Sequence, residues 1–225
     1  MKVAVIGAGN VGTALGSSIA KAGHEVVFAS RSESAATAAQ HAGGKATKGN
    51  SVRDAAASAE IVILAIPYAA VRDVAAAVDG VVAGKVVIDV TNPLSADGSG
   101  LATEPGTSAA ENIAHLMPGA RVVKAFNTMF ASVQGNPSAH NQQLDALFAT
   151  DDEMARDKVG QLVQSMGFRP VWVGPLSRAR ELEAMAFLNI ALQMATNGEW
   201  QTTYTMVAPP RASLEHRAPA AAARK

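Results

Sequence analysis

The sequence predicts an α/β protein in which helices cover both faces of a doubly wound parallel sheet. Three observations support this fold class. Short, unbroken apolar runs alternate with helical segments through the first 130 residues, as expected for parallel strands joined by crossover helices. Two further strand signals follow. A long helical stretch then ends at about residue 197. We therefore expect a small C-terminal α/β extension of the same sheet that ends in a long helix.

Composition narrows the classes of protein to consider. The chain has 225 residues, 48% of them hydrophobic, which suffices for a full core. Its formal net charge is zero without blocks of like charge, so we expect neither a nucleic acid nor a membrane as partner. It has no cysteine, which excludes disulfides and thiol catalysis, and no metal site is expected. Because no apolar run reaches about 18 residues and no signal peptide is evident, we expect a cytoplasmic protein.

The first dozen residues, MKVAVIGAGNVG, organise the rest of the chain. Val3 to Ile6 form a buried strand, and Gly7, Gly9 and Gly12 follow with G-x-G-x-x-G spacing before an amphipathic helix. In this setting the first glycine permits the tight turn, the second lets a pyrophosphate approach the backbone, and the third packs helix on strand. The helix N-terminus then holds the phosphates. This pattern predicts a dinucleotide-binding Rossmann domain. The alternative is a glycine-rich turn in another α/β fold.

The end of the second strand, Glu25 to Ala29, distinguishes the two nicotinamide cofactors. An NAD site usually has an acidic residue here that bonds the ribose 2′-hydroxyl, whereas this chain has Ser30, Arg31 and Ser32. A guanidinium can bind a 2′-phosphate through two hydrogen bonds, and hydroxyls can donate to it, so we predict NADP(H). The alternative is that Ser30 merely caps the helix expected at 32–41, in a capping box with Glu33, and that Arg31 is a surface charge. Glu33 comes late for a ribose ligand.

The remaining elements follow from apolar runs and caps. We expect strands at 45–47, 60–66, 85–90 and 121–125, and helices from the cap Ser51 to 59, at 68–78, and at 107–117 with Ser108 and Glu111 as a capping box. Residues 95–106 form a loop. Beyond them we expect a strand at 144–150, a helix from Asp151 to 166 with Gly167 as its C-cap, a strand at 168–173 and a helix at 178–197.

Ligands of doubly wound sheets bind beyond the carboxyl ends of the strands. Segments 7–11, 65–68, 89–94 and 126–130 should therefore face the ligands. We expect Pro67 and Tyr68 to line a ribose or the nicotinamide, and Asn92, with Thr91, to bond the nicotinamide amide. The alternative for Asn92 and Pro93 is a plain turn.

The long helix at 178–197 is apolar nearly all round, so it needs cover on more than one side. One side should pack on the sheet and another on a second subunit, which predicts a homodimer. We divide the chain into an NADP-binding domain at 1–130, a small acceptor-binding and dimerisation segment at 131–200, and a tail at 201–225. The tail is rich in Pro, Ala and Arg, and we expect it to be disordered.

The ordered motifs IGAGNVG, ASRS, AIPY, VTNPL, KAFNTM and MGFRPVWVGPLSRARELE resemble those of the F420-dependent NADP reductases. Those enzymes pass a hydride between NADPH and coenzyme F420, a deazaflavin. The resemblance covers about residues 1 to 200. The nucleotide domains of the six-transmembrane metalloreductases look similar, and they use NADPH and flavin to reduce ferric or cupric ions.

The resemblance implies two groups of ligand contacts. The cofactor contacts would be Gly9, Asn10, Val11, Ser30, Arg31, Ile66 and Tyr68. The deazaflavin contacts would be Asn92, Pro93, Asn127, Thr128, Met129 and Arg180. This chain departs from the family at Asn127, where these enzymes often have a histidine, and at Ala184 and Ala186, where they often have hydroxyl residues. We therefore expect a more apolar acceptor pocket.

The expected chemistry is direct hydride transfer between two bound rings. The sequence shows no nucleophile, metal cluster or paired carboxylates. Asn127 or Thr128 could orient the acceptor ring or stabilise the charge that it gains. We predict an NADPH-dependent reductase of a deazaflavin or flavin-type acceptor. Two alternatives remain: a reductase of a small imine or carbonyl substrate, and a non-catalytic NADP(H)-sensing module, which would bind the cofactor without transferring a hydride.

Overall fold

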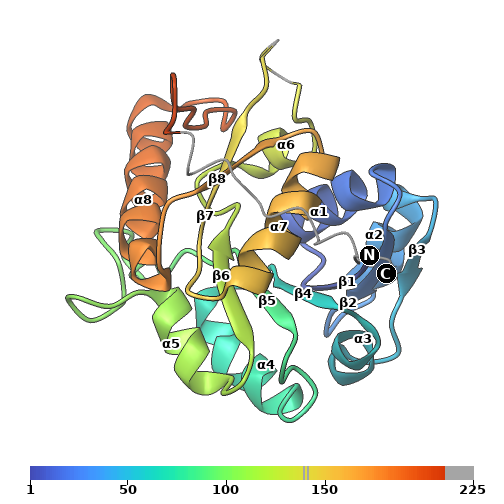
Figure 1. Ribbon diagram of the computed structural model, residues 1–225. Helices are drawn as coiled ribbons and strands as arrows, with labels where there is room; N and C mark the ends of the chain where they lie inside the picture. The colour runs from blue at the N-terminus through green and yellow to red at the C-terminus, as the bar shows by residue number, and fades with distance from the viewer. Residues whose placement is uncertain (139, 141, 211–225) are drawn as a thin grey trace, which may run out of the picture.

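The computed structural model describes residues 1–138, 140 and 142–210. Its eight strands form one sheet in the order β3-β2-β1-β4-β5-β6-β7-β8 (Figure 1). The chain therefore reverses its direction of travel across the sheet between β1 and β4, as in dinucleotide-binding folds. The strands are β1 (Lys2–Ile6), β2 (Glu25–Ala29), β3 (Ala46–Lys48), β4 (Ile61–Leu64), β5 (Val86–Asp89), β6 (Arg121–Ala125), β7 (Asp145–Ala149) and β8 (Arg169–Trp172). The predicted fold class is confirmed.

Helices cover both faces of the sheet (Figure 1). One apolar core packs α1 (Asn10–Lys21), α2 (Ser34–Ala42), α6 (Ala131–Gln134) and α7 (Glu153–Ser165) on the first face. The other core packs α3 (Val52–Ser58), α4 (Val71–Ala77) and α5 (Ala109–Leu116) on the second face. The long helix α8 (Ala179–Thr196) lies against β7 and α5 on that second face. Two 3-10 turns, η1 (Tyr68–Ala70) and η2 (Leu176–Arg178), precede α4 and α8.

The direction of β7 and β8 differs from the all-parallel sheet that we expected. β1 to β6 are parallel, but β7 pairs antiparallel with β6, and β8 is parallel to β7. A parallel neighbour of β6 would require a crossover back to the opposite edge. The segment between β6 and β7 contains only the four-residue helix α6. The chain therefore re-enters the sheet from the edge at which β6 ends.

The pairing between β6 and β7 is short, and this places the last elements beyond the sheet edge. Lys124 pairs with Ala149 and Ala125 with Phe148, and no further pairs join the two strands. Because β7 begins at Asp145, its first residues extend past the carboxyl end of β6. β8 and α8 follow this displacement. The result is a wall of protein standing over the edge where the ligands of such sheets bind.

Two of the three predicted N-terminal helix caps are confirmed. Ser51 accepts a hydrogen bond from the Asp54 N–H, and Ser108 from the Glu111 N–H. Helix α7 begins at Glu153 rather than at the predicted Asp151, and Asp152 caps it. The predicted capping box of Ser30 with Glu33 is wrong. Helix α2 begins two residues later than expected, at Ser34, and the Ser30 hydroxyl instead bonds the Ser32 carbonyl and the Ser34 hydroxyl.

Helix α8 buries polar residues beside apolar ones and exposes several large apolar side chains. Glu183, Asn189 and Gln193 are buried, whereas Leu188, Leu192 and Met194 are more than half exposed. Residues 200–206 return along this helix and are bound to it by hydrogen bonds from Asn189, Gln193 and Tyr204. The remainder of the predicted tail, 211–225, lies outside the described residues. Within the described part of the chain, no helix has the length and apolar character needed to cross a membrane.

Candidate active site

The glycine turn between β1 and α1 forms the centre of the site. Gly7 has a φ of +102°, and a Cβ added there would lie 2.1 Å from the Ala65 carbonyl oxygen. A Cβ on Gly12 would lie 2.0 Å from the Gly7 carbonyl oxygen. A Cβ on Gly9, in contrast, would meet no protein atom within 4 Å. Two of the glycines are therefore required by packing of the protein itself, and Gly9 is the one whose missing side chain leaves open space.

A cavity of about 490 Å³ lies on one side of this turn. The end of β1 and the turn before α1 form one part of its wall, and the segments that follow β2 and β4 supply most of the rest. Helix α4 adds an apolar surface. The lining residues are Ile6, Gly7, Ala8, Gly9, Ser30, Arg31, Ser32, Ser34, Val52, Ala65, Ile66, Pro67, Ala70, Asp73, Val74 and Ala77. We call this the first cavity.

Hydroxyl groups and one guanidinium meet at the β2 end of the first cavity. The hydroxyl of Ser34 lies 3.0 Å from that of Ser30 and 2.9 Å from that of Ser32. Arg31 is exposed beside them and lines the cavity. Glu33 does not line it: its carboxylate pairs with Lys48 at 2.7 Å. The nearby acidic side chain is therefore engaged elsewhere, and the predicted Ser30–Arg31–Ser32 set gains Ser34.

A second cavity of about 360 Å³ lies on the other side of the α1 N-terminus. It is formed where β5 and β6 end, beneath α8. Its lining combines residues from the first half of the chain with residues of the displaced wall: Val11, Val90, Asn92, Leu94, Asn127, Thr128, Met129, Phe130, Ala131, Gln134, Ala186, Asn189, Ile190 and Trp200. Of the expected site residues, Val11, Asn92, Asn127, Thr128 and Met129 meet here.

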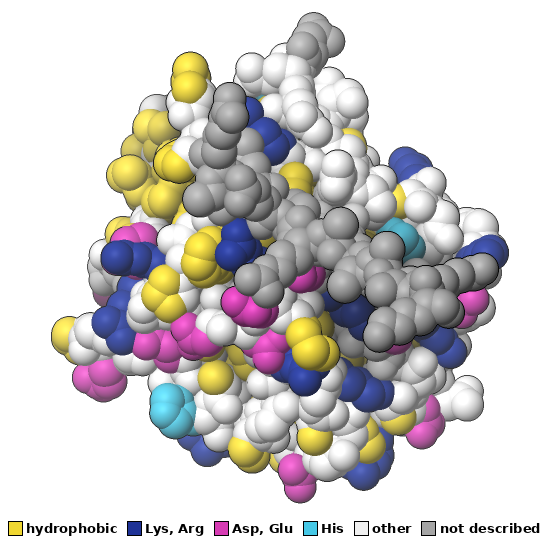
Figure 2. Space-filling view, in the orientation of Figure 1, with side chains coloured by type: hydrophobic (Ala, Val, Ile, Leu, Met, Phe, Trp, Pro, Cys, Tyr) yellow, Lys and Arg dark blue, Asp and Glu magenta, His cyan; other side chains and the backbone are white. Residues whose placement is uncertain are grey.

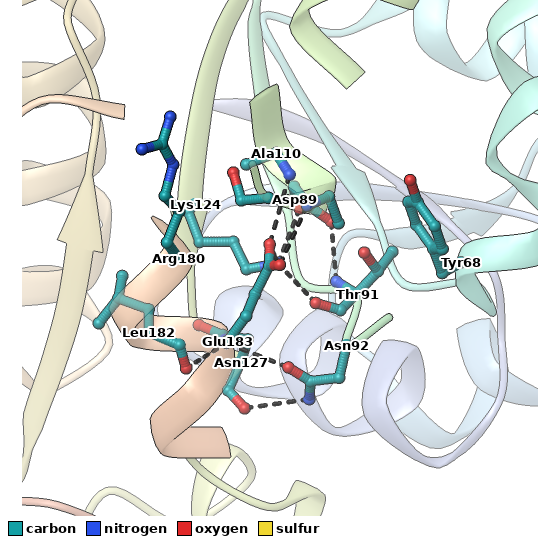
Figure 3. Close-up of polar contacts among 12 residues, drawn as sticks. Tyr68, Asp89, Thr91, Asn92, Ala110, Lys124, Asn127, Arg180, Leu182 and Glu183 are labelled. Atoms are coloured by element: carbon teal, nitrogen blue, oxygen red, sulfur yellow. Dashed lines mark hydrogen bonds and ion pairs between the residues drawn. The ribbon is translucent and has the colours of Figure 1, made fainter. Parts of the chain in front are cut away.

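Asn92 and Asn127 bond each other across this second cavity's floor (Figure 3). The Asn127 Nδ2 donates to Asn92 Oδ1 at 3.1 Å and to the Leu182 carbonyl at 3.0 Å, while Asn92 Nδ2 donates to the Asn127 carbonyl. A carbonyl can only accept, so the Leu182 contact identifies the Asn127 nitrogen. Asn127 Oδ1 is buried and has no partner among the described residues. Asn127 therefore has a free acceptor and no free donor.

The turn after β6 is strained and firmly held. Phe126 has a φ of +64°, a left-handed conformation that costs about 1–2 kcal/mol for a residue other than glycine. The buried Gln134 amide donates to the carbonyls of Phe126 and Met129, at 2.9 and 3.0 Å. These two bonds fix the backbone on both sides of Asn127 and Thr128, so the pair has a defined position at the cavity.

A buried ionic cluster lies directly behind the second cavity (Figure 3). Lys124 Nζ is 2.8 Å from Asp89 Oδ2 and 2.9 Å from Glu183 Oε1, and it donates to the Thr91 carbonyl. All three charged side chains are fully buried. Asp89 also accepts the Thr91 N–H. The cluster therefore binds both the N–H and the carbonyl of Thr91, the residue before Asn92.

Glu183 connects this cluster to two helices. Its carboxylate accepts the N–H groups of Ala109 and Ala110 at the start of α5, while the residue itself belongs to α8. Burial raises the pKa of the Glu183 carboxyl, and the Lys124 ammonium and the Ala109 N–H act against that rise. The positive end of α5 helps to balance the second buried carboxylate. The cluster thus fixes α8 at the edge of the site.

Several predicted residues lie outside both cavities. The Arg180 guanidinium bonds the Glu111 carboxylate at 2.6 and 2.9 Å and points away from the Asn92–Asn127 pair (Figure 3). The Tyr68 hydroxyl accepts a hydrogen bond from Asn112. Asn10, Gly12 and Pro93 also line neither cavity. Gly12 packs on the turn, as predicted from its position, and the ligand roles of the others stay predictions.

The ionic cluster, Ser34, and the residues Gln134, Asn189 and Trp200 of the second cavity were not predicted from the sequence. The cluster had a signal: Asp89 and Lys124 interrupt strands that are otherwise apolar, and a buried charge needs a partner. Ser34 continues the run of hydroxyl residues after β2. Trp200 had no local signal, because it follows α8 at the border of the segment that we expected to be disordered.

Comparisons with known proteins identify relatives of this chain. Residues 2–93 match the model of the family described as NADP oxidoreductase, coenzyme F420-dependent. An F420-dependent NADP reductase of Methanothermobacter marburgensis is 34% identical over 209 residues, which cover 86% of this chain and 93% of that protein. The metalloreductase STEAP3 of Rattus norvegicus is 30% identical over 82% of this chain, but the match spans only 36% of that protein.

A solved structure extends the likeness to three dimensions. A protein of Arthrobacter sp. FB24, provisionally named an F420-dependent NADP-reductase, superposes with a TM-score of 0.81 at 28% identity, over 92% of this chain and 99% of that one. Together with the match along nearly the whole archaeal reductase, the shared fold leads to one assignment. The chain belongs to the family of coenzyme F420-dependent NADP oxidoreductases.

Proposed function

We propose that this NADP-dependent oxidoreductase transfers a hydride between NADP(H) and a deazaflavin, coenzyme F420, or a flavin-type acceptor. The observation that carries the proposal is the position of the two cavities. They flank the N-terminus of α1 at the carboxyl edge of the sheet, and one has a cluster of hydroxyls with Arg31 while the other has amide groups and an apolar wall. This is the arrangement needed to bind a phosphorylated dinucleotide beside a second ring.

The residues of the first cavity fit the adenosine half of NADP(H). Arg31, with Ser30, Ser32 and Ser34, offers a charge and hydroxyl donors to a 2′-phosphate. The open space at Gly9 and the backbone N–H groups of Asn10 and Val11 suit a pyrophosphate. Ile66 and Pro67 supply apolar contacts beside the ribose. Asn127 Oδ1, which has no hydrogen-bond partner among the residues that the structure describes, supplies a polar group at the second cavity.

The chain's own residues bind, orient and exclude water, and the bound dinucleotide supplies the hydride. Because both N–H bonds of Asn127 are engaged, its free oxygen suits the orienting role rather than the stabilisation of negative charge. Thr128 and Met129 are buried beside it and keep water from the reacting atoms. Asn92 maintains Asn127 in place through the reciprocal amide bonds.

Anaerobic stopped-flow mixing tests the proposal. NADPH is mixed with the protein and, separately, with F420, FMN, a ferric chelate or a small cyclic imine, and absorbance of the reduced nicotinamide is followed. Oxidation by F420 or FMN is the expected result. Oxidation by the imine alone would favour the reductase of small substrates. Tight NADPH binding with no oxidation by any of the four would contradict the proposal and favour a sensing module.

The exposed side of α8 supports a homodimer as part of the proposal. Leu188, Leu192 and Met194 are 64%, 53% and 66% exposed, and Figure 2 shows hydrophobic side chains gathered over this helix. Exposed apolar side chains that gather on one helix are stabilised when a second copy of the chain covers them. Segment 131–200 would then both bind the acceptor and form the dimer.

Sedimentation velocity tests the dimer. Leu192→Glu should convert a dimer to a monomer, because a carboxylate would be buried without a partner at the contact. Met154→Glu is the matched control, since Met154 is 62% exposed on the separate helix α7. A wild-type protein that sediments as a monomer would refute the dimer.

A further inference from the structure

The second cavity has an aromatic wall that the reaction described so far does not use. Phe130 and Trp200 both line it, with ring centroids 5.1 Å apart and ring planes at 76°. Phe130 is the N-cap residue of α6, and Trp200 follows α8, so two distant segments supply one aromatic corner. Trp200 is 42% exposed. A large aromatic side chain left half open at a cavity is available to contact a ligand.

The backbone of Trp200 is strained and held at both ends. Its φ is +56°, a left-handed conformation that L residues with a side chain rarely adopt. The Trp200 N–H donates to Gln193 Oε1 at 2.9 Å, and its carbonyl accepts from the Ser132 hydroxyl at 2.6 Å. Strain that the surroundings maintain in this way is concentrated at functional positions.

Asn189 and Gln193, on the buried side of α8, hold this segment. Gln193 also donates to the Thr202 hydroxyl, and that hydroxyl donates to Asn189 Oδ1. Gly198 lies so close that a Cβ there would be 2.2 Å from Gln193 Oε1. Because the bonds at residues 200 and 202 come from one helix face, Trp200 has a fixed place relative to the helix that lines the same cavity.

We infer that Trp200, together with Phe130, forms the aromatic platform on which the planar ring of the acceptor stacks. This inference rests on the proposed function. The faces of aromatic rings stack in offset or edge-to-face geometry, and an open indole beside Met129 and Ile190 provides such a surface. Trp200 is therefore a binding residue for the acceptor.

The two tryptophans of the chain allow a direct optical test. Trp172 lies in β8, where its indole N–H donates to the Thr150 carbonyl and the Arg156 guanidinium covers its ring at 4.0 Å. In Trp172→Phe, Trp200 is therefore the sole indole. Titration of that variant with FMN and with 8-hydroxy-5-deazariboflavin, in the presence of NADP⁺, should quench its fluorescence saturably. Trp200→Phe, which keeps only Trp172, is the control for absorption by the probe.

Steady-state kinetics complete the test. Trp200→Gly removes the ring but suits the left-handed backbone, so it separates loss of stacking from misfolding. It should raise the acceptor KM roughly tenfold, with Trp200→Phe between it and wild type, while the Kd for NADPH stays within about twofold. Turnover of FMN or the deazariboflavin with unchanged KM and no quenching would overturn the inference and leave the proposed function standing. Absence of turnover and quenching with wild-type protein would overturn both.

Discussion

The two cavities at the carboxyl edge of the sheet are built in different ways. The first cavity is local: most of its polar groups come from the turn after β1 and the five residues after β2. The second cavity joins α1, the ends of β5 and β6, α6, α8 and Trp200, which are separated by up to about 190 residues of sequence. The first cavity depends on local backbone conformation. The second cavity depends on contacts between elements that are distant in the sequence. Substitutions should therefore damage them differently.

The largest effect on stability is expected at Lys124, whose ammonium pairs with Glu183 of α8. Lys124→Met leaves Asp89 and Glu183 buried without a cation and should lower the free energy of unfolding by about 3–5 kcal/mol. Lys158→Met is the control, because its pair with Glu60 is exposed and worth less than about 1 kcal/mol. Urea denaturation measures both. Equal, small losses would mean that the cluster contributes little to the stability.

The first cavity should respond to substitutions of its glycines in two distinct ways. Gly12→Ala brings a Cβ within 2.0 Å of the Gly7 carbonyl oxygen and should destabilise the protein by roughly 1–3 kcal/mol while reducing NADPH binding. Gly9→Ala meets no protein atom, so stability should change by less than about 0.5 kcal/mol although NADPH affinity falls. Thermal unfolding and NADPH titration are compared. Unchanged NADPH affinity in Gly9→Ala would remove this glycine from the phosphate site.

Arg31→Ala tests the cofactor preference of the first cavity. Loss of the guanidinium should weaken NADPH binding by roughly 1.5–3 kcal/mol, because two charge-assisted hydrogen bonds to the 2′-phosphate disappear. NADH lacks that phosphate and should bind as before. Calorimetric titration with both nucleotides provides the measurement. Equal weakening of the two would contradict the role given to Arg31.

The smallest effect is expected at the ion pair between Arg180 and Glu111. The hydrogen bond from Arg180 lowers the pKa of the Glu111 carboxyl, so the pair stabilises the protein above the usual carboxyl pKa, and this contribution is lost as the pH falls through the lowered value. Arg180→Met should therefore lower the stability only slightly at neutral pH, and the difference from wild type should vanish in acid. Denaturation at several pH values checks this. A large rise in acceptor KM would instead support the substrate role implied by the family.

The elements built from local patterns could be predicted, and those that depend on strand direction or distant contacts could not. The β1 turn, the Ser51 and Ser108 caps, and the apolar strands all carry their signals in adjacent residues. The antiparallel direction of β7 leaves no trace in an apolar run, because such a run reads the same in either direction. Helix α8 buries apolar residues against the sheet, as expected, but its inward face also carries Asn189 and Gln193, which bond residues 200–202 and gave no signal in the sequence.

In the site, too, residues with a local signal could be predicted and contacts between distant segments could not. Asn92 and Asn127 were recognised because each follows a buried strand, and they do meet at the second cavity. Their reciprocal pairing, which occupies both donors of Asn127, is a property of two loops together. Trp200 lies beyond the last regular element, where neither periodicity nor spacing is informative.

The short pairing between β6 and β7 has a consequence for how the two cavities can change independently. Two ladder pairs, the Lys124 cluster and the Asn127–Leu182 bond join the last third of the chain to the sheet at the site. The family model matches residues 2–93, which lie wholly within the dinucleotide half. Substitutions in the last third can therefore reshape the side of the second cavity that α8 and Trp200 form, while the glycine turn and the first cavity stay unchanged.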